Sequence, residues 1–242
     1  MVERVTQVSL FDSLAVEGVP RSTLAPAGPA PAGPAAAPAG DPFPEVTTLE
    51  DLRKAVLECR RCDLRNGCRG VVFGEGDPHA ALMLVGEGPG AVEDELGRPF
   101  VGPAGKLLDR ILAAAGFARE QVYIANIVKC RPPGNRLPTP EEAARCLPNL
   151  RAQMRLIAPR LVVCLGALAT QVLVDSRARI TAARGTWYER NGIRIMPTFH
   201  PAALLRDPSK KRPVWEDFKK VRTACDDLRN EGSRDAGLLS GG

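Results

Sequence analysis

Three polar segments each follow an apolar, strand-like run of the chain. The glycine-rich segment 86–90 follows one run, Asn126 stands near the end of a second, and His200 follows another. Closely spaced glycines let a ligand approach the backbone, and an amide offers the donor and acceptor needed to read the edge of a base. The basic segment 210–212 after His200 suits phosphate groups. Each segment also has a plain structural interpretation, as a turn or as a residue that bonds a loop.

The segment 86–91 invites comparison with nucleotide-binding loops. A Walker-type loop would need glycine in place of Phe100 and serine or threonine in place of Leu107, so that pattern fails. A dinucleotide fingerprint is formally present over 86–91, but the strand that should end in an acidic residue ends at Lys129. A nucleotide cofactor is therefore disfavoured.

The cysteines form a second group with its own chemistry. Cys59 and Cys62 make a Cys-x-x-Cys pair, and Cys130 and Cys146 follow farther along the chain. Together these two pairs of cysteines can supply four thiolates to zinc or to an iron–sulfur cluster. The arginines beside them would favour the thiolate form. Four unrelated reduced thiols are the alternative. Seven cysteines is an odd count, and the start of the chain does not look like a secretory signal, so a disulfide scaffold is disfavoured.

Regular elements must position these residues. Apolar strand-like runs alternate with helix-like segments, which predicts a mostly parallel sheet covered by helices on both faces. Such sheets bind ligands beyond the carboxyl ends of their strands, where the polar segments lie. Thr139 begins a helix as an N-cap, followed by a proline and two acidic residues. The predicted strands are 81–85, 122–128, 161–165 and 193–197, and the other predicted helices are 106–115, 167–174 and 214–228.

Composition divides the 242-residue chain into three parts. Residues 25–40 are all Ala, Pro or Gly and cannot bury enough apolar surface to become ordered, so 1–45 is predicted to be a disordered tail. A folded domain is predicted over 46–230, and a frayed end over 231–242. The tail holds five acidic and two basic residues, so the rest of the chain carries +8, against +5 for the whole. A basic domain suits an anionic partner such as nucleic acid, although plain solubility explains it equally well.

Several motifs along the predicted domain combine into one pattern. They are Cys59-x-x-Cys62, 85–90 with Glu93-Asp94, 97–102, 126–133, Cys146 and 200–205. Their order and spacing resemble the family 4 uracil-DNA glycosylases, the iron–sulfur branch of the uracil-DNA glycosylase superfamily. The resemblance extends from about residue 49 to about residue 228, nearly the whole predicted domain. Each motif is modest alone, and the combination is specific.

The resemblance implies a three-layer α/β/α sandwich around a four-stranded, mostly parallel sheet. It implies a structural [4Fe–4S] cluster held by Cys59, Cys62, Cys130 and Cys146, with zinc as the alternative metal. It also implies a monomeric, cytoplasmic, nucleoid-associated repair enzyme that excises uracil from single- or double-stranded DNA and leaves an abasic site. No apolar run is long enough to cross a membrane. The alternative function is a non-catalytic, metal-cluster module that binds nucleic acid.

The family pattern assigns a catalytic role to His200, whereas Glu87 and a DNA-binding tip are predicted from their places beside the matching motifs; many superfamily members have an Asp in the first motif, where this chain has Gly88. His200 donates a hydrogen bond to the uracil oxygen on which negative charge grows. Glu87 orients water or stabilises the sugar cation, and a purely structural role for it stays open. Leu204, Leu205 and Arg206 are expected to fill the gap that the flipped base leaves in DNA.

The same pattern assigns the residues that hold the base. Asn126 bonds the O4 and N3–H of uracil, and cytosine mispairs with that arrangement because it presents an amino group there. Phe100 stacks on the flipped ring, and the backbone of Gly88 contacts it. Glu93 occupies the space that the methyl group of thymine needs, which excludes thymine by a clash.

The tail contains one short motif that suggests a partner. Gln7, Leu10 and Phe11 resemble the segment by which bacterial replication and repair proteins dock on the sliding clamp. The two apolar side chains would enter a clamp pocket, and the Ala/Pro/Gly run would act as a spacer. Chance is the alternative, because short motifs occur freely in tails.

Overall fold

The structure is a computed structural model, which describes residues 42–239 and the burial of side chains as far as residue 231. Of the predicted tail over 1–45, only residues 42–45 are described. The clamp motif of Gln7, Leu10 and Phe11 therefore lies outside the described residues.

A mixed sheet forms the centre of the described structure, with strands β1 (Glu75–Gly76), β2 (Leu82–Gly86), β3 (Tyr123–Asn126), β4 (Leu161–Leu165), β5 (Tyr188–Arg190) and β6 (Ile193–Thr198). The strand order is β1-β3-β2-β4-β6-β5. The four central strands pair in parallel, as predicted, and β1 and β5 pair antiparallel at the two edges. The prediction of four strands missed these edges, because they are short and carry no apolar run.

The helices of the described chain are α1 (Leu49–Leu57), α2 (Leu64–Gly67), α3 (Ala91–Leu96), α4 (Pro103–Ala114), α5 (Pro140–Ile157), α6 (Ala167–Leu173), α7 (Ile180–Ala183), α8 (Pro201–Arg206) and α9 (Lys211–Leu239). Short 3-10 turns lie at η1 (Arg119–Gln121), η2 (Pro133–Asn135) and η3 (Pro208–Lys210). The predicted strands and inner helices lie within three residues of these bounds, apart from α9.

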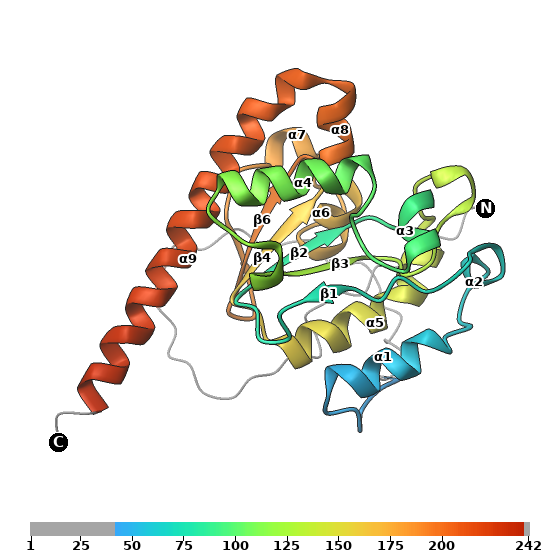
Figure 1. Cartoon of the computed structure of the whole chain (residues 1–242), viewed down its shortest axis with the longest axis horizontal. Helices are drawn as coiled ribbons and strands as arrows, with labels where there is room; N and C mark the ends of the chain where they lie inside the picture. Colours follow the sequence, from blue (N-terminus) through green and yellow to red (C-terminus); the bar gives the residue numbers. More distant parts are fainter. Residues whose placement is uncertain (1–41, 240–242) are drawn as a thin grey trace.

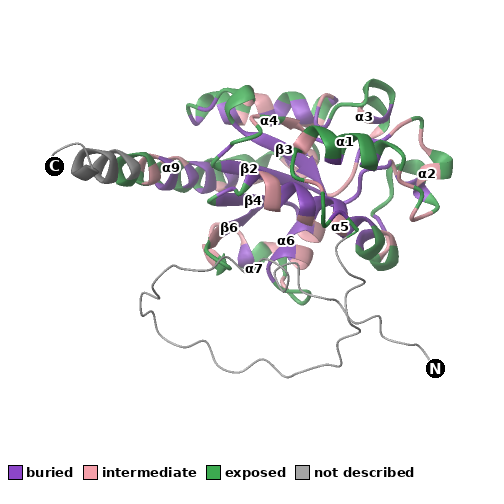
Figure 2. Cartoon of the chain, turned by 90° about the horizontal axis from the view of Figure 1, so that it is seen from below, coloured by how far each residue is buried: buried purple, intermediate pink, exposed green. Residues whose placement is uncertain are grey.

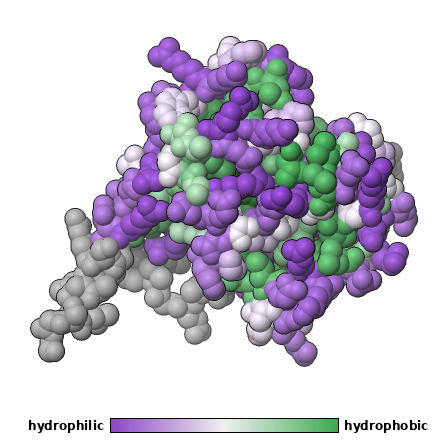
Figure 3. Space-filling model, in the orientation of Figure 1, coloured by the Kyte–Doolittle hydropathy of each residue, from purple (hydrophilic) through white to green (hydrophobic). Residues whose placement is uncertain are grey.

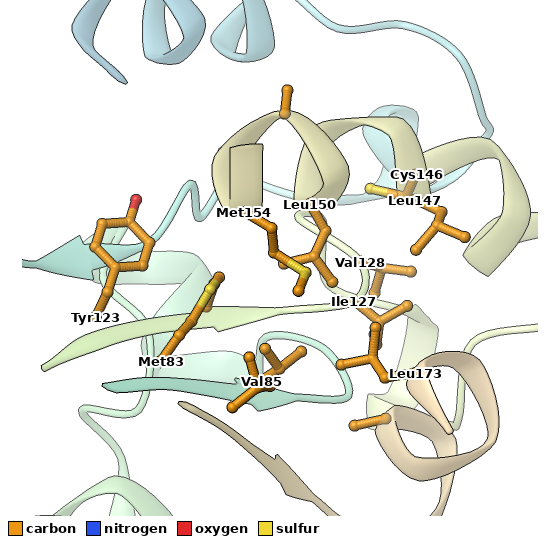
Figure 4. Packing of buried hydrophobic residues seen from close by; sticks show 14 of the residues in the cluster. Met83, Val85, Tyr123, Ile127, Val128, Cys146, Leu147, Leu150, Met154 and Leu173 are labelled. Atoms are coloured by element: carbon orange, nitrogen blue, oxygen red, sulfur yellow. The ribbon is translucent and has the colours of Figure 1, made fainter. Parts of the chain in front are cut away.

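Helices cover both faces of the sheet, which confirms the three-layer fold. Figure 1 shows α4 and α5 on opposite sides of it. Met83 and Val85 of β2 point into the layer of α1, α5 and α6, where they lie beneath Leu150 and Met154 of α5 (Figure 4). The alternate residues of β2, Leu82 and Leu84, point into the layer of α4, α8 and α9. Figure 2 shows the strands buried between half-exposed helices.

Helix α5 begins where the sequence predicts. The Thr139 Oγ1 accepts a hydrogen bond from the Glu142 N–H at 3.2 Å, and the Glu142 carboxylate accepts one from the Thr139 N–H at 2.7 Å. This reciprocal pair is a capping box, which satisfies amide groups that the helix itself leaves unbonded.

Helix α9 is longer than predicted at both ends. It begins at Lys211 and continues to Leu239, so it includes most of the segment 231–242 that was predicted to be a frayed end. Val214, Phe218 and Val221 bury the first half of the helix against the sheet. The apolar spacing fades after Leu228, but the arginine and glutamate residues that follow favour helix without it.

Candidate active site

The main cavity of the described structure opens at the carboxyl ends of the parallel strands, as the fold class predicts. Its volume is about 620 Å³. The structure places every residue that sequence analysis assigned to catalysis or base binding in its lining: Glu87, Gly88, Glu93, Phe100, Asn126 and His200. They come from the ends of β2, β3 and β6 and from the segments around α3, so distant parts of the chain meet here.

Asn126 ends β3 at the base of this cavity. Its side chain is 2% exposed, and its Oδ1 atom is buried without a hydrogen-bond partner among the described residues. The neighbouring strand has Gly86 at the paired position, and a Cβ there would overlap both Asn126 Oδ1 and the ring of Phe100. Because glycine has no side chain, Gly86 leaves the space that the Asn126 side chain and the Phe100 ring occupy.

Phe100 forms a buried wall of the cavity in an unusual backbone conformation. Its φ is +52°, and a Cβ on Gly105 would overlap its carbonyl group. Its ring lies 5.5 Å from the ring of His200, at 33° between the planes. The Arg119 guanidinium supports this segment, because it bonds the Pro99 carbonyl at 2.5 Å. Sequence analysis missed Arg119, which stands in a polar turn far from the site in sequence.

Arg119 is itself held by two carboxylates. Its Nη2 and Nε atoms lie 2.7 and 2.9 Å from Glu75 Oε1, and its Nη1 lies 2.6 Å from Asp109 Oδ1. Arg98 also bonds Glu75, at 2.7 Å. The edge strand β1 therefore supports the wall of the cavity from behind.

Glu93 lies in α3 and faces the amino end of α4. Its Oε1 atom accepts hydrogen bonds from the backbone N–H groups of Val101 and Gly102, at 3.0 and 2.8 Å. The carboxylate therefore caps α4 while it lines the cavity. The sequence motif predicted a place for Glu93 in the base pocket but not its role as a helix cap.

Glu87 lies beside the amino end of α6. Its Oε1 atom accepts a hydrogen bond from the Leu168 N–H at 3.3 Å. Burial raises the pKa of this carboxyl above its ordinary value, although hydrogen bonds from Leu168 and Ala167 and the charge of Arg206 oppose the shift. Gly166 leaves room for it, since a Cβ there would lie 2.6 Å from Glu87 Oε1.

His200 is the N-cap of α8. Its Nδ1 atom accepts a hydrogen bond from the Ala202 N–H at 3.1 Å, so in the neutral ring the proton is on Nε2. Burial and the nearby Arg206 charge lower the pKa of His200 to about 4. At neutral pH this imidazole is an uncharged donor at Nε2, which sequence alone could not establish.

The strand that precedes His200, β6, is fixed at its end by a buried carboxylate. Asp217 of α9 accepts a hydrogen bond from Thr198 Oγ1 at 2.6 Å and pairs with Arg184 at 2.5 Å. Thr198 ends β6, two residues before His200. Helix α9 thereby holds the end of β6 in place.

The rim of the cavity is basic and carries exposed apolar side chains. Arg206 and Lys210 line it. Leu205 is 47% exposed, whereas Leu204 is 1% exposed and packs in the core. Of the predicted tip, Leu205 and Arg206 are thus exposed, whereas Leu204 lies on the face of α8 that packs against α4.

Leu137 is a rim residue that sequence analysis missed. It lines the cavity on the loop before α5 and is 61% exposed. Arg136 steadies this loop by bonding the Leu137 carbonyl at 2.9 Å and the Glu142 carboxylate at 2.6 and 2.8 Å. An apolar residue between an arginine and a proline was the available signal. On the face shown in Figure 3 hydrophilic side chains predominate, with apolar ones between them.

The four predicted metal ligands lie around one second, smaller cavity. Cys59, Cys62, Cys130 and Cys146 all line it. The Lys129 N–H points to Cys146 Sγ at 3.3 Å, and Asn149 Nδ2 lies 3.5 Å from the same atom. As the side chains stand, no three potential metal ligands in the described part of the chain are grouped closely enough to hold an ion. The thiol set and its N–H donors fit a thiophilic metal.

Comparisons with known proteins agree with this geometry. The uracil DNA glycosylase superfamily profile matches residues 73–219, which include Glu87, Asn126, His200 and the other residues named in the lining of the main cavity, but not Cys59 and Cys62. No helix in the described part of the chain is long and apolar enough to span a membrane.

Several relatives share most of the chain. A type-4 uracil-DNA glycosylase of Thermotoga maritima is 46% identical over 181 residues, 72% of this chain and 93% of the relative. One of Archaeoglobus fulgidus is 41% identical over 186 residues, 74% of this chain and 94% of the relative. A type-5 uracil-DNA glycosylase of Pyrobaculum aerophilum is 34% identical over 146 residues, 53% of this chain and 64% of the relative. As its motifs predicted, the chain belongs to the uracil-DNA glycosylase superfamily and, within it, to the type-4 uracil-DNA glycosylases.

Proposed function

We propose that this protein excises uracil from DNA by hydrolysing its N-glycosidic bond, which leaves an abasic site for base excision repair. The observation that carries the proposal is the buried, unpartnered Oδ1 of Asn126 in the lining of the cavity. A buried acceptor without a partner is costly unless a ligand completes it. The N3–H of a flipped uracil supplies the missing donor, and the relatives named above carry this activity in their names.

In the reaction, the bond between uracil N1 and deoxyribose C1′ breaks, and its electron pair leaves with the base. His200 donates from Nε2 to the uracil oxygen on which that charge grows, and it does so as a neutral ring. Glu87 positions the water whose oxygen bonds to C1′, and its carboxylate accepts the proton of that water. The raised pKa of Glu87 makes it a stronger base than an exposed carboxylate.

Two side chains distinguish uracil from the other pyrimidines. Asn126 donates to O4 and accepts from N3–H, whereas cytosine offers a donor and an acceptor in the opposite order. Glu93, fixed by the N–H groups of Val101 and Gly102, fills the space of a 5-methyl group and so rejects thymine. Phe100 stacks on the flipped ring, beside the backbone of Gly88.

The direct test is a cleavage assay on oligonucleotides that carry one uracil, cytosine or thymine. We expect strand scission at uracil alone after alkaline treatment of the abasic product, with single- and double-stranded substrates compared. Binding without excision would instead support the alternative of a non-catalytic module that binds nucleic acid.

The acid side of the pH profile tests Glu87. Because burial raises the pKa of Glu87 and the reaction needs the ionised carboxylate, kcat should be constant above that raised pKa and fall as pH drops through it. His200 should not contribute above pH 5, since it is already neutral there. The Glu87→Gln variant should have a low kcat at every pH, and its kcat should no longer fall on the acid side. Initial rates measured as a function of pH would show this. An acid-side fall that persists in Glu87→Gln would remove Glu87 from this role.

The metal centre is proposed to be a [4Fe–4S] cluster at Cys59, Cys62, Cys130 and Cys146, rather than zinc. Burial raises the pKa of the Cys130 and Cys146 thiols, so a bound metal is what would keep them as thiolates. When bound, the cluster supplies cross-links between the segment of Cys59, the loop after β3 and helix α5. The hydrolysis uses the other cavity and needs no redox step.

Substitution of one predicted ligand tests the metal assignment. Cys62→Ser is expected to lose the brown colour and most of the iron of an anaerobic preparation and to lower the melting temperature, because the cross-link contributes folding free energy. The matched control is Cys225→Ala, a buried cysteine of α9 outside the cavity. Unchanged iron content in Cys62→Ser, or zinc in the parent protein, would contradict the assignment.

DNA is proposed to lie across the rim, with Leu205 and Leu137 replacing the stacking that the flipped base loses. Leu137→Ala should lower kcat/KM on double-stranded uracil DNA about tenfold and affect single-stranded DNA less, because only a duplex must be held open. The matched control is Leu96→Ala, which removes a leucine of similar exposure, 58%, on α3 outside the cavity lining. Equal losses on both substrates would show that Leu137 does not act as a wedge.

The tail is proposed to tether the enzyme to a sliding clamp through Gln7, Leu10 and Phe11. Two large apolar residues beside a tail of small residues support this. Deleting residues 1–12 should abolish clamp pull-down and leave excision on naked DNA intact, and an unchanged pull-down would refute it.

A further inference from the structure

Lys129 is a buried cation that the proposed hydrolysis does not use. It follows β3 by three residues, and it is 1% exposed. Its Nζ atom donates to the backbone oxygen of Asn126 at 2.9 Å and to Gln153 Oε1 at 2.6 Å. Both acceptors are neutral, and no carboxylate in the described part of the chain pairs with it. A buried ammonium without a counter-charge is strongly unfavourable.

A metal held by the thiolates of the cysteine cavity would supply the anion that is missing. Lys129 lines that cavity together with Cys130 and Cys146. Its own backbone N–H points to Cys146 Sγ at 3.3 Å. Four thiolates around zinc or a [4Fe–4S] core leave a net negative charge, which a neighbouring ammonium would balance at short range in a poorly solvated interior.

The lysine is held firmly in this place. Gln153 cannot turn away, because its Nε2 atom donates to the Phe73 carbonyl at 2.9 Å and lies 3.1 Å from the Tyr123 hydroxyl. The Val72 N–H donates to the Lys129 carbonyl at 2.7 Å. Its two acceptors therefore fix the ammonium, while the backbone N–H of the same residue points to Cys146 Sγ.

We propose that Lys129 is the counter-cation of the metal–thiolate centre and the positioning residue that links it to Asn126. Its charge is balanced by the thiolates, and its Nζ–H fixes the carbonyl of the residue that reads uracil. The inference rests on the metal centre in the proposed function. It explains why a structural metal lies beside a base pocket: the buried charge that the metal centre stabilises is the charge that orients Asn126.

The test compares Lys129→Met with the parent protein, both isolated anaerobically. Methionine keeps most of the side-chain volume and removes the charge. We expect the variant to release iron to a chelator at least tenfold faster, followed by the loss of visible absorbance. On uracil DNA we expect kcat to fall at least tenfold while KM changes less than twofold, because rim contacts rather than Asn126 set DNA affinity. Lys54→Met, which removes an exposed lysine of α1, is the control and should match the parent.

The Gln153→Glu variant distinguishes a counter-charge role of Lys129 from a purely structural role, in which its hydrogen bonds only hold the fold together. It also provides a test if Lys129→Met fails to fold. A carboxylate beside Lys129 would compete with the thiolates for its charge, so we expect faster iron release although the lysine remains. If Lys129 had only a structural role, the new ion pair would strengthen it, and iron release would stay at the parent rate.

The outcomes separate this inference from the proposed function. Parent-like iron release and kcat in folded Lys129→Met, or parent-like iron release in Gln153→Glu, would overturn the role of Lys129 alone. A parent protein that excises uracil but binds no metal would overturn the metal centre and, with it, this inference. A parent that leaves uracil DNA intact would refute the proposed function itself.

Discussion

His200→Ala is expected to lower kcat for uracil excision roughly 100- to 1000-fold, the usual cost of removing one donor to a developing oxyanion. KM should change little, because the Nε2–H bond is strongest once charge has moved onto the base. Single-turnover kinetics on a uracil oligonucleotide would measure the effect. The control is His79→Ala, the other histidine, which lies in an exposed turn.

His200→Asn separates chemistry from folding. His200 also caps α8 through Nδ1, and losing an N-cap costs about 1 kcal/mol of stability. Asparagine can accept the same bond from the Ala202 N–H, so its melting temperature should match the parent while kcat stays as low as in His200→Ala. If His200→Asn restored activity together with stability, the cap rather than the Nε2 donor would be the function of His200.

Asn126→Asp is expected to lower kcat/KM on uracil by about 10⁴-fold, because a site built to bond a substrate group rejects a mismatch by that order. The carboxylate places an acceptor opposite uracil O4, where the parent amide donates. The preference for uracil over cytosine should also narrow, since the cytosine amino group can donate to the new acceptor. Excision of both bases by the same preparation is the measurement.

Asn135→Asp is the matched control for that change. Asn135 lines the same cavity, but it is exposed and its Oδ1 atom already accepts a hydrogen bond from Arg131 Nε at 2.7 Å. We expect it to keep activity within a few-fold of the parent. Parent-like discrimination in Asn126→Asp would mean that another group reads the base.

Local sequence patterns predicted much of the framework. The capping residues at Thr139 and Glu142 identify the start of α5, because every atom of that signal lies within one helical turn. Continuous apolar runs predicted the four parallel strands, since strands covered on both faces need apolar residues at every position. The short edge strands β1 and β5 have no such requirement, and they were missed.

Side-chain direction was the weakest part of the prediction. Leu204 and Leu205 are adjacent and chemically identical, yet one is buried against α4 and the other meets solvent. Which of them faces outward depends on how a six-residue helix is docked, and that is set by contacts far along the chain. Leu137 was missed for the same reason, because its place on the rim depends on the packing of α5.

The types and order of residues by themselves determined the fold class, the family and the strand ends at which Glu87, Asn126 and His200 stand. Only the tertiary structure decided the proton position and low pKa of His200, the unpartnered oxygen of Asn126, and the burial of Lys129 beside the cysteines. The physical reason is that propensity and periodicity act between near neighbours. Burial and hydrogen-bond satisfaction depend instead on groups that only folding brings together.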